Sequence, residues 1–151
     1  MADERVIMPE PVNRCSFRVL YGDTDSGGVV YYANYLRYFE LGRTEYMRQY
    51  VESYRALEER GFIMPVVKCF VRFKASAFYD DLIIISTSLV EVKKRSCRFN
   101  NKIHRKEDGK LLVKGYTIHA TVDRSGKLAA LPDDLMNRLK AVLNYPVNVS
   151  L

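Results

Sequence analysis

The sequence is poor in residues on which several classes of protein depend. It has no tryptophan, two histidines and three cysteines among 151 residues. The number of cysteines is odd, and they lie far apart in the sequence without a Cys-x-x-Cys pair, at Cys15, Cys69 and Cys97. We therefore expect neither a disulfide framework nor a cysteine metal site. Free thiols are typical of the reducing cytoplasm. We therefore expect a cytoplasmic protein whose three thiols are buried.

Further absences exclude other classes. No apolar run reaches the roughly 20 residues of a transmembrane helix, and the acidic, proline-containing N-terminus is unlike a signal peptide. The sequence has no Gly-x-Ser-x-Gly, His-Glu-x-x-His, Walker or Rossmann pattern. His104 and His119 lie in strand patterns, far along the chain from the motif described below. Serine-hydrolase, zinc and nucleotide-dependent chemistry are therefore disfavoured.

The charge is unbalanced, with a net value of +6. A positive surface favours anionic partners, such as nucleic acid, an anionic membrane surface, an acidic carrier protein or a phosphorylated cofactor. The cations are not gathered in a tail, and no nucleic-acid-binding module is recognisable. We therefore expect no nucleic-acid partner and no stable membrane insertion.

Hydrophobic periodicity predicts one α+β domain. Alternation predicts strands over 14–21, 66–78, 82–92, 96–106 and 111–123, with a hairpin turn at Asp108-Gly109. Helical spacing predicts a long helix over about 29–50, a short helix over 52–60 that stops at Gly61, and a terminal helix opened by Pro132. The expected order is β-α-β-β-β-β-α, with residues 1–12 as a flexible N-terminal arm, 13–145 as the domain and 146–151 as a C-terminal tail.

The patterns also predict which faces are buried. The first turns of the long helix are apolar around most of their circumference, which indicates a helix enclosed by other elements. The strand over 66–78 is expected to bury one face, whereas its other face carries Lys68, Arg72 and Lys74 to solvent. The apolar face of the terminal helix consists of Leu135, Leu139 and Leu143.

The segment from Tyr21 to Glu40 carries the most chemistry. Asp23 and Asp25 lie in a polar, glycine-bearing turn that leads into the long helix. Unpaired N–H groups at a helix start can accept the negative charge that develops on a carbonyl under attack. Asp25 could deprotonate a water or attack the carbonyl itself, or it could serve only as a helix cap or Asx-turn. For Asp23 we expect the structural role of bonding the backbone of the turn.

This segment resembles the signature of the 4-hydroxybenzoyl-CoA thioesterase family of hot-dog-fold proteins, and especially its Tol–Pal-associated bacterial acyl-CoA thioesterase branch. The pattern is aromatic-x-Asp-x-Asp-x-x-Gly-x-Val-Tyr-x-x-x-Tyr, then an aromatic, a Glu and an Arg, and the chain fills it with Tyr21, Asp23, Asp25, Gly28, Val30, Tyr31, Tyr35, Phe39, Glu40 and Arg43. The resemblance extends from about Arg14 to about Leu143. It implies a single-domain hot-dog fold, in which a five-stranded antiparallel sheet wraps the central helix. It also implies acyl-CoA thioesterase activity without a metal or an organic cofactor.

The resemblance implies roles for individual residues. Asp25 takes the position of the catalytic carboxylate, and Tyr32 the position whose backbone N–H polarises the thioester carbonyl, although its ring could simply be a core aromatic or a pocket wall. Gly28, which could also be an ordinary turn glycine, lies with Val30 and Tyr31 where substrate is expected to bind. The basic run of Lys93, Lys94 and Arg95 takes the position that contacts the nucleotide end of coenzyme A, or it is an ordinary solvated turn.

The resemblance further implies a homodimer, often doubled to a homotetramer, with active sites at the subunit interface. The expected substrate is an acyl-CoA with an aryl or aliphatic acyl group, and an acyl carrier protein is a possible partner. Two other classes stay open at this point. One is a non-catalytic module that binds acyl-CoA or acyl carrier protein on the same fold, and the other is a basic protein that binds nucleic acid or an anionic membrane.

Overall fold

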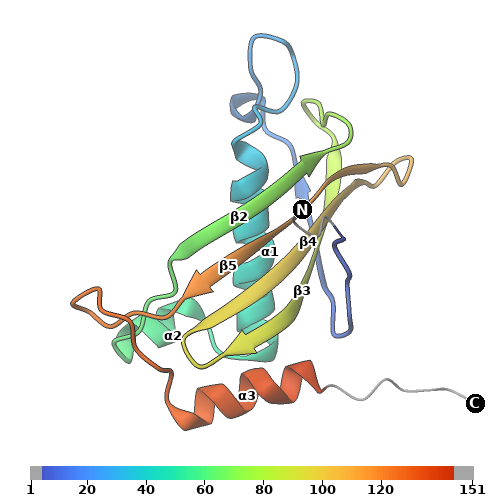
Figure 1. Cartoon of the computed structure of the whole chain (residues 1–151). Helices are drawn as coiled ribbons and strands as arrows, with labels where there is room; N and C mark the ends of the chain where they lie inside the picture. Colours follow the sequence, from blue (N-terminus) through green and yellow to red (C-terminus); the bar gives the residue numbers. More distant parts are fainter. Residues whose placement is uncertain (1–4, 145–151) are drawn as a thin grey trace, which may run out of the picture.

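A curved five-stranded antiparallel sheet wraps one long helix in the computed structural model, which describes residues 5–144 (Figure 1). The order of strands across the sheet is β1-β3-β4-β5-β2. The elements are, in chain order, β1 (Asn13–Arg18), the 3-10 turn η1 (Tyr21–Asp23), α1 (Asn34–Tyr50), α2 (Tyr54–Glu59), β2 (Val66–Phe73), β3 (Leu82–Lys93), β4 (Ser96–Arg105), β5 (Leu111–Ala120) and α3 (Asp133–Leu143). The predicted β-α-β-β-β-β-α order and hot-dog architecture are confirmed. The predicted tail 146–151 lies outside the described residues.

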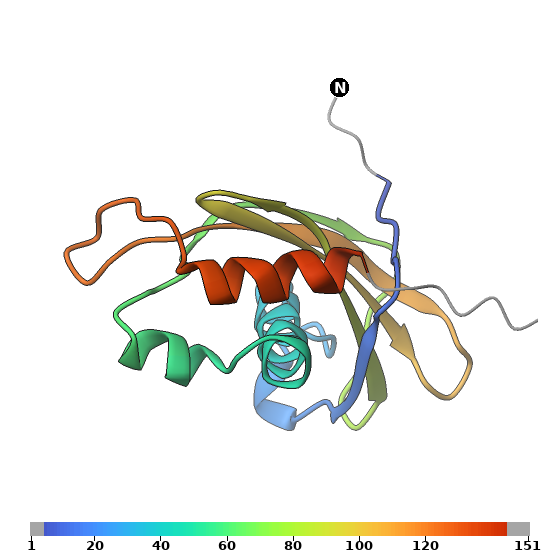
Figure 2. The same ribbon diagram turned by 90° about the horizontal axis from the view of Figure 1, so that it is seen from below.

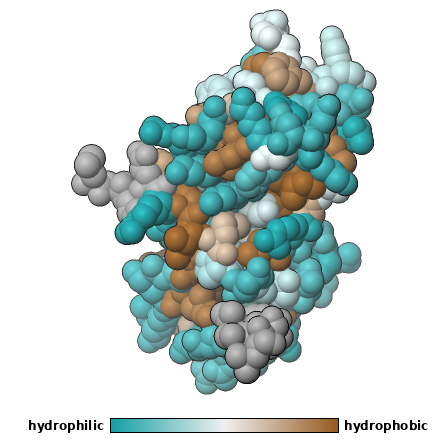
Figure 3. All heavy atoms as spheres, turned by 90° about the vertical axis from the view of Figure 1, so that its right-hand side faces the viewer, coloured by the Kyte–Doolittle hydropathy of each residue, from teal (hydrophilic) through white to brown (hydrophobic). Residues whose placement is uncertain are grey.

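Seen from below, the sheet curves over α1, and α3 crosses the same end of the molecule as α2 (Figure 2). The side that carries β1 and the N-terminal arm shows hydrophobic residues interspersed with hydrophilic ones (Figure 3). The described part of this arm is bonded to the sheet, because Asn100 Nδ2 donates to Ile7 O at 2.9 Å and the Ser88 hydroxyl donates to Pro9 O. Val6 and Val12 of the arm are buried.

The long helix begins later than its apolar pattern predicts. Residues 29–33 are not helical, and α1 starts at Asn34. Val29 and Val30 instead pair in extended conformation with Phe78 and Thr24, as β-branched residues favour. The predicted burial of the helix start is also wrong at its outermost positions, because Tyr31, Tyr32 and Leu36 are exposed.

Two buried clusters hold α1 against the sheet. At the upper end, Tyr35, Tyr38 and Phe39 pack with apolar residues of β3, β4 and β5. At the lower end, Tyr46 and Met47 pack with residues of α2, β3, β4 and α3. The helix approaches the sheet closely at glycines: a Cβ on Gly42 would lie 2.7 Å from Ile85 Cγ2, and one on Gly115 would lie 2.9 Å from Phe39 Cε2.

β2 departs from its predicted burial. It ends at Phe73 rather than at residue 78, and within residues 5–144 it is an edge strand that pairs only with β5. The prediction of one buried face holds only in part, because Ala77 is buried and Val71 and Ala75 pack against the core, whereas Val67, Cys69 and Phe73 of the same face are exposed. In one chain, therefore, nothing within residues 5–144 covers either face of β2 fully.

Three smaller predictions are also tested. The terminal helix buries Leu135 and Leu139 as predicted, but its third buried residue is Val142, whereas Leu143 is 37% exposed. All three cysteines are free thiols, of which Cys97 is buried, Cys15 is half-buried and Cys69 is exposed, so the prediction of three buried thiols is wrong. Within residues 5–144, no helix has the length and apolar content needed to span a membrane.

The core near α3 contains a histidine whose protonation opposes folding. The His119 ring is buried edge-on against Phe99, 5.6 Å between ring centroids, and its nitrogens bond to Met64 O at 3.1 Å and Thr117 Oγ1 at 2.8 Å. Burial, with the nearby Arg43 cation as a smaller cause, lowers the pKa of His119 from 6.5 to about 4. Between pH 6.5 and pH 4 the unfolded chain takes up a proton that the folded chain does not. The free energy of unfolding must therefore decrease as the pH is lowered through this range.

We expect the free energy of unfolding to drop, through His119 alone, by up to about 1.4 kcal/mol for each pH unit below 6.5 until about pH 4. Urea unfolding of the parent and of His119→Gln at several pH values measures this contribution. The parent should show the steeper pH dependence, and His104→Gln, at a partly exposed site, should keep most of that slope. Parallel curves for parent and His119→Gln would contradict the assignment.

Candidate active site

Asp25 lies in the loop that joins η1 to α1. Its Oδ1 accepts a hydrogen bond from Gly27 N at 2.8 Å, and its own N–H donates to Val29 O at 2.9 Å. The carboxylate therefore forms an Asx-turn at an exposed site. Gly28 closes the turn with a φ of +81°, a conformation that glycine adopts readily. The prediction that Asp25 and Gly28 directly adjoin the helix start in sequence is wrong, since the extended Val29 and Val30 intervene.

The extended segment nevertheless folds Asp25 back toward the helix start. Asp25, Val29, Val30, Tyr32 and Tyr35 line one pocket of about 350 Å³, together with Phe73, Lys74, Ala75 and Ser76 from the end of β2 and the loop after it. The structure thus brings Asp25, Val30 and Tyr32 of the predicted site together. The predicted residue Tyr31 contacts the ring of Tyr32, at 4.7 Å between ring centroids, but does not line this pocket.

The turn that leads into α1 offers unpaired donors. Within residues 5–144, the backbone N–H groups of Tyr32 and Ala33 make no hydrogen bond, whereas the N–H of Tyr31 donates to Asp23 O at 2.9 Å. Unpaired N–H groups and the positive end of the helix dipole are both expected at such a start. The ring of Tyr32 is 62% exposed and packs edge-on near Phe73, so it is a pocket wall and not a core aromatic.

Asp23 faces the other side of the loop. It is buried, and its Oδ2 accepts from Leu20 N and from the Tyr38 hydroxyl, each at 3.0 Å. Its carbonyl accepts from Asn34 Nδ2 at 2.9 Å. Burial and the hydrogen bond to Asp23 raise the pKa of Tyr38, so this hydroxyl stays protonated and donating. Asp23 therefore ties the segment after β1 to α1, which confirms the expected structural role.

A second groove adjoins Asp23. It has a volume of about 430 Å³ and runs along α1, lined by Phe17, Leu20, Asp23, Arg37, Tyr38, Glu40, Leu41 and Thr44. Asp25 is not among its lining residues. The two carboxylates of the Asp-x-Asp motif therefore open onto separate hollows, and only Asp25 shares one with the start of α1.

The basic run lies far from this site in a single chain. Lys93, Lys94 and Arg95 connect β3 to β4 at the lower end of the sheet, whereas the Asp25 loop lies at the upper end (Figure 1). The 17-residue helix α1 separates these ends, a length of about 25 Å. Lys93 and Lys94 line a hollow of about 460 Å³ with Lys140 of α3, and Lys93 Nζ lies 3.2 Å from Glu91 Oε1.

Three cations near these hollows were not identified as site residues from the sequence. Lys74, expected on a solvated strand face, lines the Asp25 pocket, and Lys140 joins the hollow of the basic run. Arg105 anchors the loop that carries Lys74, through contacts described below. These positions depend on contacts between distant segments, for which one sequence carries no local signal. Within residues 5–144, no three His, Cys, Asp or Glu side chains are placed to hold a metal ion.

Comparison with known proteins identifies the family. The family model described as Thioesterase-like superfamily matches residues 19–139. The chain is 34% identical over 128 residues to the acyl-CoA thioester hydrolase YbgC of Escherichia coli, an alignment that spans 84% of this chain and 95% of that protein. It is 30% identical over 95 residues to the 4-hydroxybenzoyl-CoA thioesterase of a Pseudomonas species, across 61% of this chain and 67% of that protein.

The fold is shared with solved structures. The crystal structure of a 1,4-dihydroxy-2-naphthoyl-CoA thioesterase from Synechocystis superposes with a TM-score of 0.79 at 21% identity, covering 89% of this chain and 99% of that one. Because the family model spans most of the chain, including the Asp25 loop, α1 and strands β2 to β5, the chain belongs to the Thioesterase-like superfamily.

Proposed function

We propose that this protein hydrolyses acyl-CoA thioesters, with Asp25 as general base or nucleophile. The observation that carries the proposal is the pocket that Asp25 shares with Tyr32, whose backbone N–H has no partner within residues 5–144. A carboxylate and unpaired donors beside one hollow are the groups that acyl hydrolysis needs. The enzyme class, a thioester hydrolase, follows from the family, and the acyl-CoA substrate agrees with the name of the Escherichia coli relative.

The reaction can run in two ways at this site. As a base, Asp25 takes a proton from water while the water oxygen attacks the thioester carbonyl. As a nucleophile, the Asp25 carboxylate attacks the carbonyl itself and forms an anhydride, which water then hydrolyses. In both, the N–H groups at the start of α1 stabilise the tetrahedral oxyanion, and the intermediate expels the coenzyme A thiolate, which takes up a proton. Val30 contacts the substrate in the pocket, and Gly28 and Tyr31 contact it where it passes the turn outside the pocket.

The basic run supplies affinity for the coenzyme in this proposal. Lys93, Lys94 and Arg95 can pair with its phosphates, and Lys140 adds a fourth cation beside Lys93 and Lys94. Since this run lies at the opposite end of α1 from Asp25, one chain cannot offer both to a single substrate unless the substrate spans that length. We therefore infer a homodimer or homotetramer in which the basic run of one subunit approaches the Asp25 pocket of another.

The exposed surface of β2 supports an assembly. Val66, Val67 and Phe73 are 47%, 62% and 49% exposed on this edge strand, and Tyr32 is exposed beside Phe73. Apolar side chains concentrated along an unpaired strand edge mark a site for association. Burial of this edge against a second copy would also close one side of the Asp25 pocket, which Phe73 lines.

One observation favours a second candidate function. The Asp25 carboxylate already accepts a hydrogen bond from Gly27 N, as a purely structural Asx-turn would require. If that is its only role, the pocket binds an acyl-CoA or an acyl carrier protein without cleaving it. Release of free thiol from an acyl-CoA panel, lost in an Asp25 variant, separates the enzyme from the binding module.

The first prediction from the proposed function concerns the two carboxylates. Asp25→Asn keeps an oxygen that can accept from Gly27 N, so it should cost about 1 kcal/mol of stability or less, since Asn and Asp cap almost equally well. An amide is neither a base nor a nucleophile, so kcat should fall by about 10²–10⁴. Melting temperature and kcat, measured side by side, test both statements.

Asp23→Asn is the matched control, with the same chemical change two positions away. It weakens a buried acceptor for Leu20 N and the Tyr38 hydroxyl, so it should lose about 1–3 kcal/mol of stability with a milder effect on turnover. A folded Asp25→Asn with parental turnover, or a folded Asp23→Asn that is the inactive one, would show that the wrong carboxylate is assigned.

The second prediction concerns the basic run. Replacing Lys93, Lys94 and Arg95 together by Ala should raise KM much more than it lowers kcat, as loss of uniform binding does. The KM of the parent should also rise with salt, because screening weakens exposed charge pairs. Kinetics with coenzyme A and dephospho-coenzyme A thioesters measure the contribution of one phosphate. If both thioesters give the same KM and kcat, and the triple variant has the KM of the parent, the basic run does not bind the coenzyme phosphates.

The third prediction concerns the assembly. Light scattering after gel filtration should give the mass of a dimer or a larger species at micromolar concentration. Val67→Lys places a charge on the exposed face of β2 and should shift the population toward monomer with reduced kcat. A fully active monomer would refute the shared site, while leaving the assignment of Asp25 untouched.

A further inference from the structure

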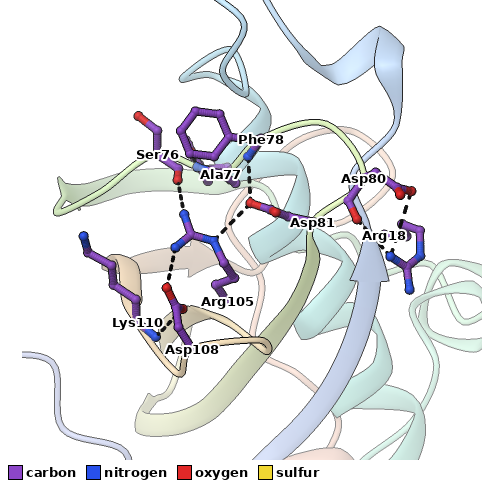
Figure 4. Close-up of polar contacts among 10 residues, drawn as sticks. Arg18, Ser76, Ala77, Phe78, Asp80, Asp81, Arg105, Asp108 and Lys110 are labelled. Carbon is purple, nitrogen blue, oxygen red and sulfur yellow. Dashed lines mark hydrogen bonds and ion pairs between the residues drawn. The ribbon is translucent and has the colours of Figure 1, made fainter.

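Arg105 joins the loop between β2 and β3 to the turn between β4 and β5 at the upper end of the sheet. It is the last residue of β4, and its side chain is only 12% exposed (Figure 4). Its guanidinium donates to Ser76 O at 2.7 Å, to Asp81 Oδ2 at 3.1 Å and to Asp108 Oδ2 at 2.8 Å. Each of its three nitrogens thus has its own acceptor, an arrangement that only the planar fork of arginine provides.

The segment that Arg105 holds is one wall of the Asp25 pocket. Residues 74–76, in the loop between β2 and β3, line that pocket opposite the Asp25 loop. The next residue, Ala77, accepts a hydrogen bond from Val30 N at 2.9 Å through its carbonyl. Arg105 bonds the carbonyl just before it, at Ser76. The guanidinium is therefore one residue away from the backbone bond that positions Val30.

Two more contacts tie the same wall to the site. The Ala77 N–H donates to the Tyr35 hydroxyl at 3.0 Å, and Phe78 pairs with Val29. The N–H of Phe78 donates at 2.9 Å to Asp81 Oδ2, the oxygen that also accepts from Arg105. Arg105 thus orients the carboxylate that fixes Phe78, in addition to its direct bond to the loop backbone.

We propose that Arg105 is a positioning residue for thioester hydrolysis, a role that rests on the function proposed above. It fixes the loop 74–78 against Val29 and Val30, and so sets the width of the pocket between that loop and Asp25. Arg105 does not line the pocket, so it acts through the loop rather than on substrate. Small displacements of a positioned group are costly in rate, since about 1 Å can cost about 100-fold.

The sheet itself does not depend on this guanidinium. The turn after β4 is closed by backbone bonds, from Arg105 N to Lys110 O at 2.9 Å and from Gly109 N to Arg105 O at 2.8 Å. β4 is anchored by Phe99 and Ile103, both fully buried in the core. A change of the side chain at residue 105 should therefore leave the fold in place and act on the loop.

The test uses Arg105→Lys, which keeps the charge but has one nitrogen in place of three. Arg60→Lys is the matched control, because Arg60 also bonds two carboxylates, Asp134 at 2.8 Å and Glu52 at 3.3 Å, near α2 and α3 at the other end of the molecule. Both variants are assayed well below their own melting temperatures. We expect kcat of Arg105→Lys to fall by about 10- to 100-fold, with KM within about twofold of the parent, and Arg60→Lys to keep the parental kcat.

Hydrogen exchange gives a readout that does not require turnover. The amides of Val30 and Ala77 should exchange faster in Arg105→Lys than in the parent, and at the parental rate in Arg60→Lys. Parental exchange at these amides, parental kcat in Arg105→Lys, or an equal loss of kcat in Arg60→Lys would each overturn the proposal. A parent that releases no thiol from any acyl-CoA would instead refute the proposed function. The two failures can be told apart, because hydrogen exchange tests the effect of Arg105 on the loop without measuring turnover.

Discussion

The structure depends on the close approach of α1 to the inner face of the sheet. Gly42 on the helix and Gly115 on β5 leave no room for a Cβ, because the side chain of Ile85 packs on the helix backbone at Gly42 and the ring of Phe39 packs on the strand backbone at Gly115. This contact lets the aromatic residues of α1 fill the curve of the sheet from both ends. Interiors packed to this density transmit displacement rather than absorb it. The start of α1 and the loops at its upper end are therefore held by the same core.

The pocket at that end is built by two short extended pairings rather than by the helix. Val30 N bonds to Ala77 O, and Val29 pairs with Phe78, so the Asp25 loop is attached to the loop after β2. Had the helix begun at Val29, as its apolar pattern predicts, Asp25 would lie only three residues before the N-cap position. The extended segment instead places a turn of chain between the carboxylate and the helix, and the space enclosed by that turn becomes the pocket shared with Tyr32.

The sequence predicts the elements and the motif well because both are local. Alternation and helical spacing give the order of strands and helices, and the spacing of Asp23, Asp25 and Gly28 identifies the segment that carries the candidate site. The predictions are wrong where contacts between segments far apart in the sequence determine the structure. The exposure of β2 depends on its place at the sheet edge. Val30 is extended rather than helical because its N–H bonds to Ala77 O. Lys74 lines the pocket because of the path of the loop after β2. None of these three contacts leaves a local pattern in one amino-acid sequence.

The same edge position connects the incomplete burial of β2 with the proposed chemistry. A strand that exposes Val67 and Phe73 is a poor end to a sheet in water, because apolar side chains and unpaired backbone groups both favour a further partner. Phe73 also lines the Asp25 pocket. In the proposed assembly, a second copy on this edge would therefore also shield the pocket from water, and a drier pocket would strengthen the interaction of an oxyanion with the N–H groups at the start of α1. In the proposed function, assembly and catalysis are linked through Phe73 at the strand end, because covering this residue would enclose the hollow beside the exposed Asp25 carboxylate.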